Sequence, residues 1–163
     1  MTDQQQTHRL TVTAEGDREI VTERVFDAPR ERVFQAFVDP ELVRQWWGRR
    51  EDTTTVEKMD VRVGGDWRFV TEGPDGSHAF YGTYRAIEPP ETLEQTFEWE
   101  GMPGHVVIER AEFEDLGDGR TKVTTHSLFD TTEERDGMLA AGMESGQSES
   151  YERLDELLAG TED

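Results

Sequence analysis

The side chains of this chain that are able to do acid–base or metal chemistry are scattered and form no known motif. The four histidines, His8, His78, His105 and His126, include no i,i+4 pair and no HExxH sequence, so a zinc site is not expected. The chain has no cysteine, which excludes disulfides, thiolate metal sites and a cysteine nucleophile. No GxGxxG, GxxxxGKS/T or GxSxG sequence occurs, so no phosphate-binding loop or serine-hydrolase turn is predicted. We therefore expect no metal and no cofactor.

Aromatic residues with period-two spacing are a stronger signal than the titratable groups. They recur on one face of three successive segments, with Trp67 and Phe69 in the first, His78, Phe80 and Tyr84 in the second, and Gln95, Phe97 and Trp99 in the third. Two interpretations are open. The face is either ordinary core, in which each buried side chain contributes about 1.5–3 kcal/mol, or the wall of an apolar small-molecule pocket with a few polar anchors.

A ligand-binding cavity lined by this face would also receive residues from helices. The predicted C-terminal helix offers Met138, Met143 and Tyr151, and a short helix near residue 40 ends on Trp46 and Trp47, which either pack at one end of the domain or gate the pocket. His78, Tyr84, Gln95 and Tyr151 are the candidate polar anchors. The complete candidate lining is Trp46, Trp47, Trp67, Phe69, His78, Phe80, Tyr84, Gln95, Phe97, Trp99, Met138, Met143 and Tyr151.

Strands and helices to position these residues can be placed along the chain. Asp27-Ala28-Pro29 ends a strand and starts an amphipathic helix, and Asp39-Pro40 starts a second, short one. Thr131 with Glu134 predicts a capping box at the start of a long helix over residues 132–159. Strands are predicted over residues 8–14, 19–26, 53–63, 66–72, 77–87, 92–100, 105–114 and 120–129.

These elements predict a single α+β domain. Most strands are joined by hairpin-length turns, which implies an antiparallel sheet, and one apolar face per strand is most simply covered by the last helix. In the strand over residues 19–26, Val21/Val25 and Ile20/Phe26 compete for the inner face. We expect residues 1–18 to be a polar extension, frayed over residues 1–7 and carrying an extra strand, and residues 19–160 to be the domain.

Charge narrows the range of partners. The chain of 163 residues has a formal net charge of −20 spread from end to end, and 33% hydrophobic residues. Nucleic acid and anionic membranes need clustered basic residues, which are absent, so neither partner is expected. No apolar run is long enough to span a bilayer and the N-terminus lacks a hydrophobic signal core, so we expect a cytoplasmic protein. The acidic surface suits a high-salt cytoplasm, which favours a halophilic source.

Four stretches of the chain resemble one known family. RVFDAPRERVFQAFVDPELVRQWWG (24–48), DVRVGGDWRF (60–69), GTYRAIEPPETL (82–93) and ERDGM…GMESGQSESYERLDELL (134–158) are similar to the activator-of-heat-shock-protein-ATPase-like family of the START-like, or SRPBCC, superfamily. The resemblance covers nearly the whole chain from about Glu19, in the expected order. Together the motifs are highly specific, although each alone is modest.

The resemblance implies a helix-grip fold, in which a curved antiparallel sheet wraps a long C-terminal helix and two short helices close one end. A cavity between sheet and helix often holds apolar ligands in this superfamily, which includes lipid carriers, hormone receptors, aromatase/cyclases, oxygenase domains and co-chaperones. Fold therefore does not give function. One position departs from the family: Gln147 stands where a tryptophan is common. If Gln147 faces the cavity, the pocket is wider or wetter there.

The leading hypothesis is a non-enzymatic binding protein for a small apolar or aromatic molecule. One alternative is an acid–base enzyme of the aromatase/cyclase kind, with Tyr, His or Glu in the cavity. A second alternative is a co-chaperone of a heat-shock ATPase, as the family's name suggests. An exposed aromatic rim around Trp46 and Trp47 would also support a homodimer.

Overall fold

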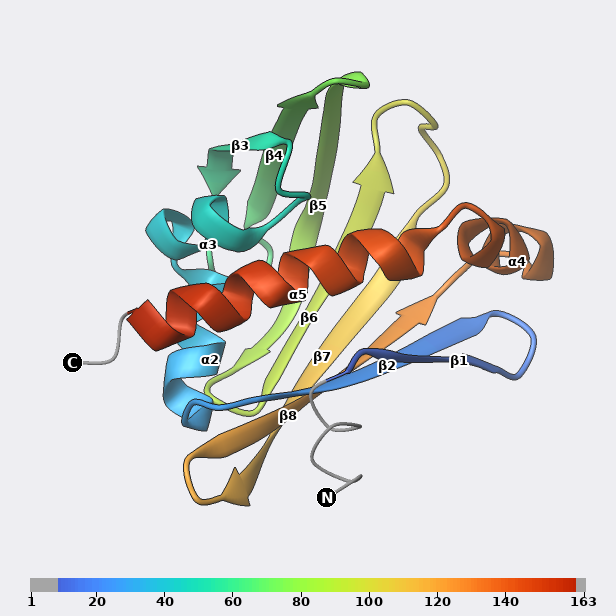
Figure 1. Ribbon diagram of the computed structural model, residues 1–163. Helices are drawn as coiled ribbons and strands as arrows, with labels where there is room; N and C mark the ends of the chain where they lie inside the picture. Colours follow the sequence, from blue (N-terminus) through green and yellow to red (C-terminus); the bar gives the residue numbers. More distant parts are fainter. Residues whose placement is uncertain (1–8, 161–163) are drawn as a thin grey trace.

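The computed structural model describes residues 9–160, which form an 8-stranded antiparallel sheet and four helices (Figure 1). Residues 1–7 and His8, for which a frayed end and a strand start were expected, lie outside the described residues. The strands are β1 (Thr11–Glu15), β2 (Glu19–Phe26), β3 (Thr53–Met59), β4 (Asp66–Gly73), β5 (Gly76–Glu88), β6 (Thr92–Trp99), β7 (Val107–Gly117) and β8 (Arg120–Leu128). The helices are α2 (Arg30–Val38), α3 (Pro40–Trp46), α4 (Thr132–Ala140) and α5 (Met143–Gly160).

The sheet has the order β1-β2-β8-β7-β6-β5-β4-β3, with every neighbouring pair antiparallel. Strands β3 to β8 follow one another through short turns. Strand β8 then pairs with β2, so a strand from the start of the chain is hydrogen-bonded to the last strand in the sequence. The sheet curves, α5 crosses its concave face, and α2 and α3 stand at one end (Figure 1). The predicted helix-grip fold is confirmed.

The competition for the inner face of β2 is decided by contacts with α5. Ile20 and Phe26 are fully buried, and between them Thr22 and Arg24 point the same way. The Phe26 ring lies 5.1 Å from the Tyr151 ring of α5, and Arg24 forms a 2.6 Å ion pair with Asp155 of α5. Two polar residues on the concave face explain why the hydrophobic pattern of this strand was ambiguous.

The prediction of one helix over residues 132–159 is wrong, because the segment forms two helices, α4 and α5, separated at Ala141 and Gly142. Gly142 has φ +85°, a conformation that glycine adopts without the cost of a Cβ. At the start of α4, Thr131 Oγ1 accepts a hydrogen bond from the Glu134 amide at 3.1 Å, as a capping box requires. The Glu134 carboxylate instead contacts His105 Nδ1 at 2.6 Å, so only half of the box forms.

The domain is tightly packed where α2 and α3 meet the sheet. Trp46 is 4% exposed, and its indole Nε1 donates a hydrogen bond to the Ala36 carbonyl at 2.9 Å. The Phe37 ring lies 4.9 Å from Trp46 and 5.1 Å from Phe113. This end of the concave face is filled by side chains.

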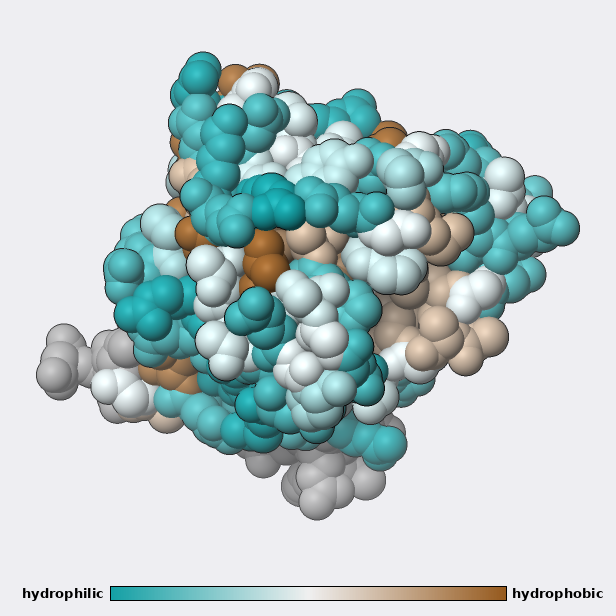
Figure 2. Space-filling model, turned by 90° about the horizontal axis from the view of Figure 1, so that it is seen from above, coloured by the Kyte–Doolittle hydropathy of each residue, from teal (hydrophilic) through white to brown (hydrophobic). Residues whose placement is uncertain are grey.

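The hydropathy of the surface is consistent with a chain in which 33% of the residues are charged. Figure 2 shows one face covered mainly by hydrophilic residues, with apolar side chains visible only in small areas. Within residues 9–160, no helix is both long and apolar enough to cross a membrane.

Candidate functional site

A cavity of about 500 Å³ lies between the concave face of the sheet and α5. Strands β4 to β8 form its wall, and residues from α2, α3, α4, α5 and the loop after α3 complete it. Its size falls within the ~300–1,000 Å³ that is usual for small-molecule sites. Protein interiors have few voids larger than a water molecule, so a space of this size is not ordinary core packing.

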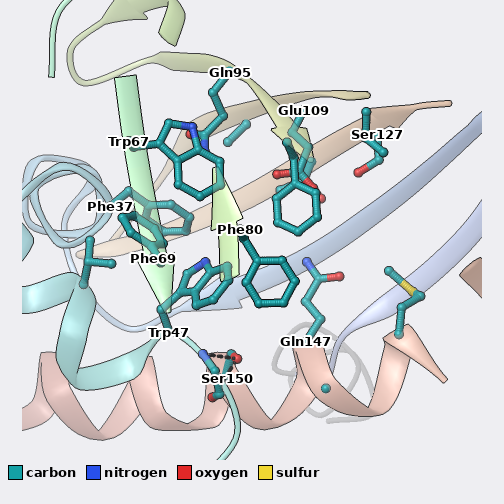
Figure 3. A pocket seen from close by; sticks show the side chains of 18 of the residues that line it. Phe37, Trp47, Trp67, Phe69, Phe80, Gln95, Glu109, Ser127, Gln147 and Ser150 are labelled. Carbon is teal, nitrogen blue, oxygen red and sulfur yellow. Dashed lines mark hydrogen bonds between the residues drawn. The ribbon is translucent and has the colours of Figure 1, made fainter. Parts of the chain in front are cut away.

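One side of the cavity is a continuous group of aromatic rings. Trp47 stands with its ring centroid 5.2 Å from Phe69 and 5.3 Å from Phe80. Phe80 stacks on Phe97 at 5.4 Å, and Trp67 lies 4.7 Å from Phe69. Figure 3 shows Trp67, Phe69 and Phe80 of β4 and β5 together with Trp47, which directly follows α3.

The structure gathers the sequence-predicted residues around this cavity, with one exception. Those that line it are Trp46, Trp47, Trp67, Phe69, Phe80, Tyr84, Gln95, Phe97, Trp99, Met138, Met143 and Tyr151. His78 does not line it and lies beside the Trp99 ring, 5.8 Å away, at the rim of a separate polar groove. His78 follows the inner-face alternation of β5 but comes too early in the strand to reach the cavity, so it is not an anchor within it.

The tryptophan pair is divided between two environments. Trp46 is buried in the packed end, whereas Trp47 is half-buried and reaches the other aromatic rings of the cavity. The aromatic rim that suggested a homodimer is therefore not exposed at Trp46. The homodimer itself stays a prediction.

Hydrogen bonds join the loop after α3 to α5, and these bonds fix the position of Trp47, the first residue of the loop. The Gly48 amide donates to Ser150 Oγ at 3.1 Å, and this hydroxyl donates to the Gly48 carbonyl at 2.9 Å (Figure 3). Arg153 also donates to the carbonyls of Gln45 and Gly48, at 2.8 and 3.1 Å. A side chain at Gly48 would require φ +101° and would lie 2.9 Å from Thr54 Oγ1, so glycine suits this position.

Glu109 of β7 is the functional candidate that sequence reasoning missed. It lines the cavity, and among the described residues its carboxylate has neither a hydrogen bond nor an ion pair. Burial raises the pKa of Glu109 to about 7, and no nearby positive charge offsets this effect. The available signal was the alternation of Val107, Ala111 and Phe113, which places Glu109 on their face of the strand.

Hydroxyl and amide groups also line the cavity. Gln147 of α5 faces the cavity, and its Nε2 donates to Thr22 Oγ1 at 3.1 Å; Thr22 in turn is hydrogen-bonded to Thr125 of β8. Burial raises the pKa of Tyr151 to about 12, a shift that a hydrogen bond with Gln147 reduces and the Glu109 charge increases. The amide at Gln147 thus makes this wall polar, where a tryptophan would make it apolar.

The arrangement is suited to holding an aromatic molecule by its rings and one polar group by Glu109. In residues 9–160, no group of three or more His, Asp or Glu side chains is placed to hold a metal ion. A carboxyl with a pKa of about 7 is able to give or take a proton near neutral pH. The cavity is therefore chemically suited both to binding an aromatic ligand and to proton transfer by Glu109.

Comparison with known proteins agrees with this architecture. The chain is similar to a protein from Arthrobacter aurescens, with 28% identity, a TM-score of 0.83, and coverage of 94% of this chain and 93% of that one. It is also similar to a Rhodobacter sphaeroides protein, with 25% identity, a TM-score of 0.85, and coverage of 94% and 99%. An HSP90 activator from Plasmodium falciparum has 18% identity and a TM-score of 0.53 over 68% of this chain and 72% of that one, a likeness of fold alone.

No curated protein matches the chain. The family model described as "Activator of Hsp90 ATPase homolog 1-like protein" matches residues 27–159, which is most of the sequence and includes α2, α3, the strands of the cavity and most of α5. The chain belongs to the Activator of Hsp90 ATPase homolog 1-like family, within the START-like superfamily.

Proposed function

We propose that this protein binds a small, largely aromatic molecule in the cavity between the sheet and α5. One observation carries the proposal: a space of about 500 Å³ is lined by aromatic rings and contains a carboxylate without a protein partner. Filling such a space with a ligand removes apolar surface from water, which is favourable by about 25 cal/mol for each Å². A ligand with a polar group would also provide Glu109 with the partner that it lacks.

Binding is tested with N-phenyl-1-naphthylamine, an uncharged probe that fluoresces more strongly in apolar surroundings. We expect saturable fluorescence with a micromolar Kd and quenching of tryptophan emission, because Trp47 and Trp67 line the cavity. The variant Gln147→Trp fills the cavity from α5 and is expected to weaken binding at least about tenfold, which corresponds to about 1.4 kcal/mol.

The matched control is Ser145→Trp, which adds the same side chain at an exposed position near the start of α5. It is expected to leave the Kd within about twofold of the unmodified protein. Equal binding to all three proteins would show that the probe binds elsewhere, and an absence of saturable binding would argue against the proposal.

Acid–base catalysis is a second candidate function, favoured by the raised pKa of Glu109. A carboxylate in an apolar pocket is able to remove a proton next to a carbonyl group. Exchange of the α-protons of α-tetralone with solvent deuterium, followed by NMR, tests this activity. Catalysed exchange that falls about 10²–10⁴-fold in Glu109→Gln would support an enzyme, whereas exchange at the buffer rate would argue against one.

The co-chaperone alternative depends on the family's name alone. The Plasmodium falciparum HSP90 activator shares the fold but too little sequence to transfer its role. Measuring whether the protein stimulates the ATPase of an Hsp90 tests this alternative directly.

A further inference from the structure

We propose that the cavity selects aromatic molecules that carry a protonated amine, and that Glu109 binds the ammonium group. This inference rests on the proposed ligand-binding function and names the class of ligand. It follows from three features of the described residues: the isolation of one carboxylate, the rings around it, and the pairing of the nearby cations.

The isolation of Glu109 is unusual for a carboxylate on β7. Glu112 pairs with Arg110 at 3.2 Å, and Glu114 pairs with Lys122 of β8 at 3.7 Å. Glu109 lies one residue from Arg110, but alternation sends the two side chains to opposite faces of the sheet. Since buried charges are normally paired, Glu109 has the properties of a group whose partner comes from outside the protein.

The rings of the cavity favour a cation over an anion or a neutral group. Trp47, Trp67, Phe69, Phe80 and Phe97 all line it. The face of an aromatic ring carries partial negative charge and attracts ammonium groups, by about 0.5–2 kcal/mol for each contact. Rings together with one carboxylate form the combination that recognises an ammonium ion attached to an apolar body.

No cation among the described lining residues is free to neutralise Glu109. Arg49, in the loop over α5, pairs with Glu51 at 3.9 Å, and the side chain of Arg110 pairs on the convex face. From β2, Arg24 forms its ion pair with Asp155. The other titratable groups in the lining are Asp52 in the same loop, Tyr84 of β5 and Tyr151 of α5, none of which supplies positive charge.

The net charge of the whole chain also favours a cationic ligand. A net charge of −20 attracts cations and repels anions such as fatty acids from the cavity entrance. The pKa of Glu109 in the free protein is raised to about 7, so an ammonium ligand must also displace its proton at lower pH. Affinity for an amine is therefore expected to increase from about pH 6 to pH 8 as Glu109 ionises.

Three naphthalene probes of similar shape test the inference near pH 8, where Glu109 is mainly ionised. They are 1-naphthylmethylamine, 1-naphthalenemethanol and 1-naphthoic acid, which are a cation, a neutral molecule and an anion. We expect the amine to bind about 10–100-fold more tightly than the alcohol, the size of a hydrogen bond to a charged group, and the acid to bind most weakly.

Two variants separate a local contact from general electrostatics. Glu109→Gln removes the cavity charge, and we expect it to lower amine affinity at least about tenfold while alcohol affinity stays within about twofold. Glu112→Gln removes one charge from the opposite face of the same strand and is expected to leave the amine preference unchanged. Circular dichroism verifies that each variant is folded.

The possible results distinguish this inference from the proposed function. If the alcohol binds as tightly as the amine, amine selection is wrong and aromatic binding stands. If Glu109→Gln keeps the preference for the amine, the assignment of the ammonium site to Glu109 is wrong. If Glu112→Gln loses the preference as fully as Glu109→Gln, the effect is long-range and the assignment to Glu109 is wrong. If neither these probes nor N-phenyl-1-naphthylamine binds, both proposals are wrong.

Discussion

Neighbouring residues of β7 point to opposite faces of the sheet, and the two faces hold their charges differently. On the convex face, Arg110 pairs with Glu94 of β6 and with Glu112, and Glu94 also pairs with Arg85 of β5. On the concave face, Glu109 has no partner among the described residues. One strand thus carries a paired network on one side and an isolated charge on the other.

The difference shows which charges support the fold and which are available to a ligand. Ion pairs exposed to water contribute a median of about 0–1 kcal/mol each, so the convex network stabilises the protein little. The concave carboxylate loses hydration without gaining a partner, and this cost raises its pKa. A group that destabilises the free protein is a stronger candidate for function than a group that is already satisfied.

The largest expected effect is on the free energy of unfolding, and it compares a ring buried at the packed end of the concave face with a ring on the aromatic side of the cavity. Trp46→Ala is expected to lower the free energy of unfolding by about 3–5 kcal/mol, because it removes a buried ring and its hydrogen bond to Ala36. Phe80→Ala is expected to cost less, since part of the Phe80 ring faces the cavity instead of protein atoms. Urea unfolding of both variants measures the difference, and equal losses would mean that the cavity wall is packed like core.

The second expected effect is a gain in the free energy of unfolding when the isolated carboxylate of Glu109 is removed, opposite in sign to the losses expected for Trp46→Ala and Phe80→Ala. Burial raises the pKa of Glu109 from 4.5 to about 7, so between these values the folded protein holds a proton that the unfolded chain has lost. The contribution of Glu109 to stability is therefore greatest below pH 4.5 and is lost as the pH rises to about 7. Glu109→Gln is expected to stabilise the protein by up to about 3 kcal/mol near pH 8 and by almost nothing near pH 4.

Urea unfolding of both proteins across this pH range measures the effect of Glu109→Gln. Solvent in the cavity would make the gain smaller, but it would not reverse its sign. Equal stabilities at every pH would contradict the desolvation of Glu109 and weaken the contrast between the two faces.

The smallest effect is expected on the convex face. Arg110→Met removes ion pairs to Glu94 and Glu112, yet we expect a loss of at most about 1 kcal/mol, because water already solvates these charges. Adding salt should reduce the loss further, since exposed pairs are screened. A loss above about 2 kcal/mol that is insensitive to salt would show that the convex network is structural.

The fold could be predicted because its signals are local. Alternation and turn residues placed the eight strands within a few residues, and Pro29 and Pro40 marked the two short helices. The break at Gly142 was missed because a glycine within a helical pattern has two outcomes, tolerated or helix-ending, and the local sequence does not choose between them.

The cavity was harder to predict. Alternation predicts which face of the sheet a side chain lies on, but it does not predict whether that side chain reaches the cavity or how deeply it is buried. Trp46 and Trp47 are adjacent and chemically identical, and both line the cavity, yet Trp46 is buried against α2 whereas Trp47 is half-buried and contacts rings of β4 and β5. His78 follows the correct alternation but lies too far along β5. Glu109 follows the alternation of Val107 and Ala111, but its burial depends on elements that are distant in sequence, since α5 and the loop after α3 complete the cavity around it.

The pairing of β2 with β8 has a consequence for the order of assembly. Glu19 aligns with Leu128 and Phe26 with Thr121, so roughly a hundred residues must be synthesised after β2 before its partner exists. The strands from β3 to β8 join neighbours in sequence and are able to form hairpins as they emerge from the ribosome, whereas closure at β2 must wait. Until α5 follows, the aromatic face that later surrounds the cavity is uncovered, and the strongly negative charge of the chain then helps to keep nascent molecules apart.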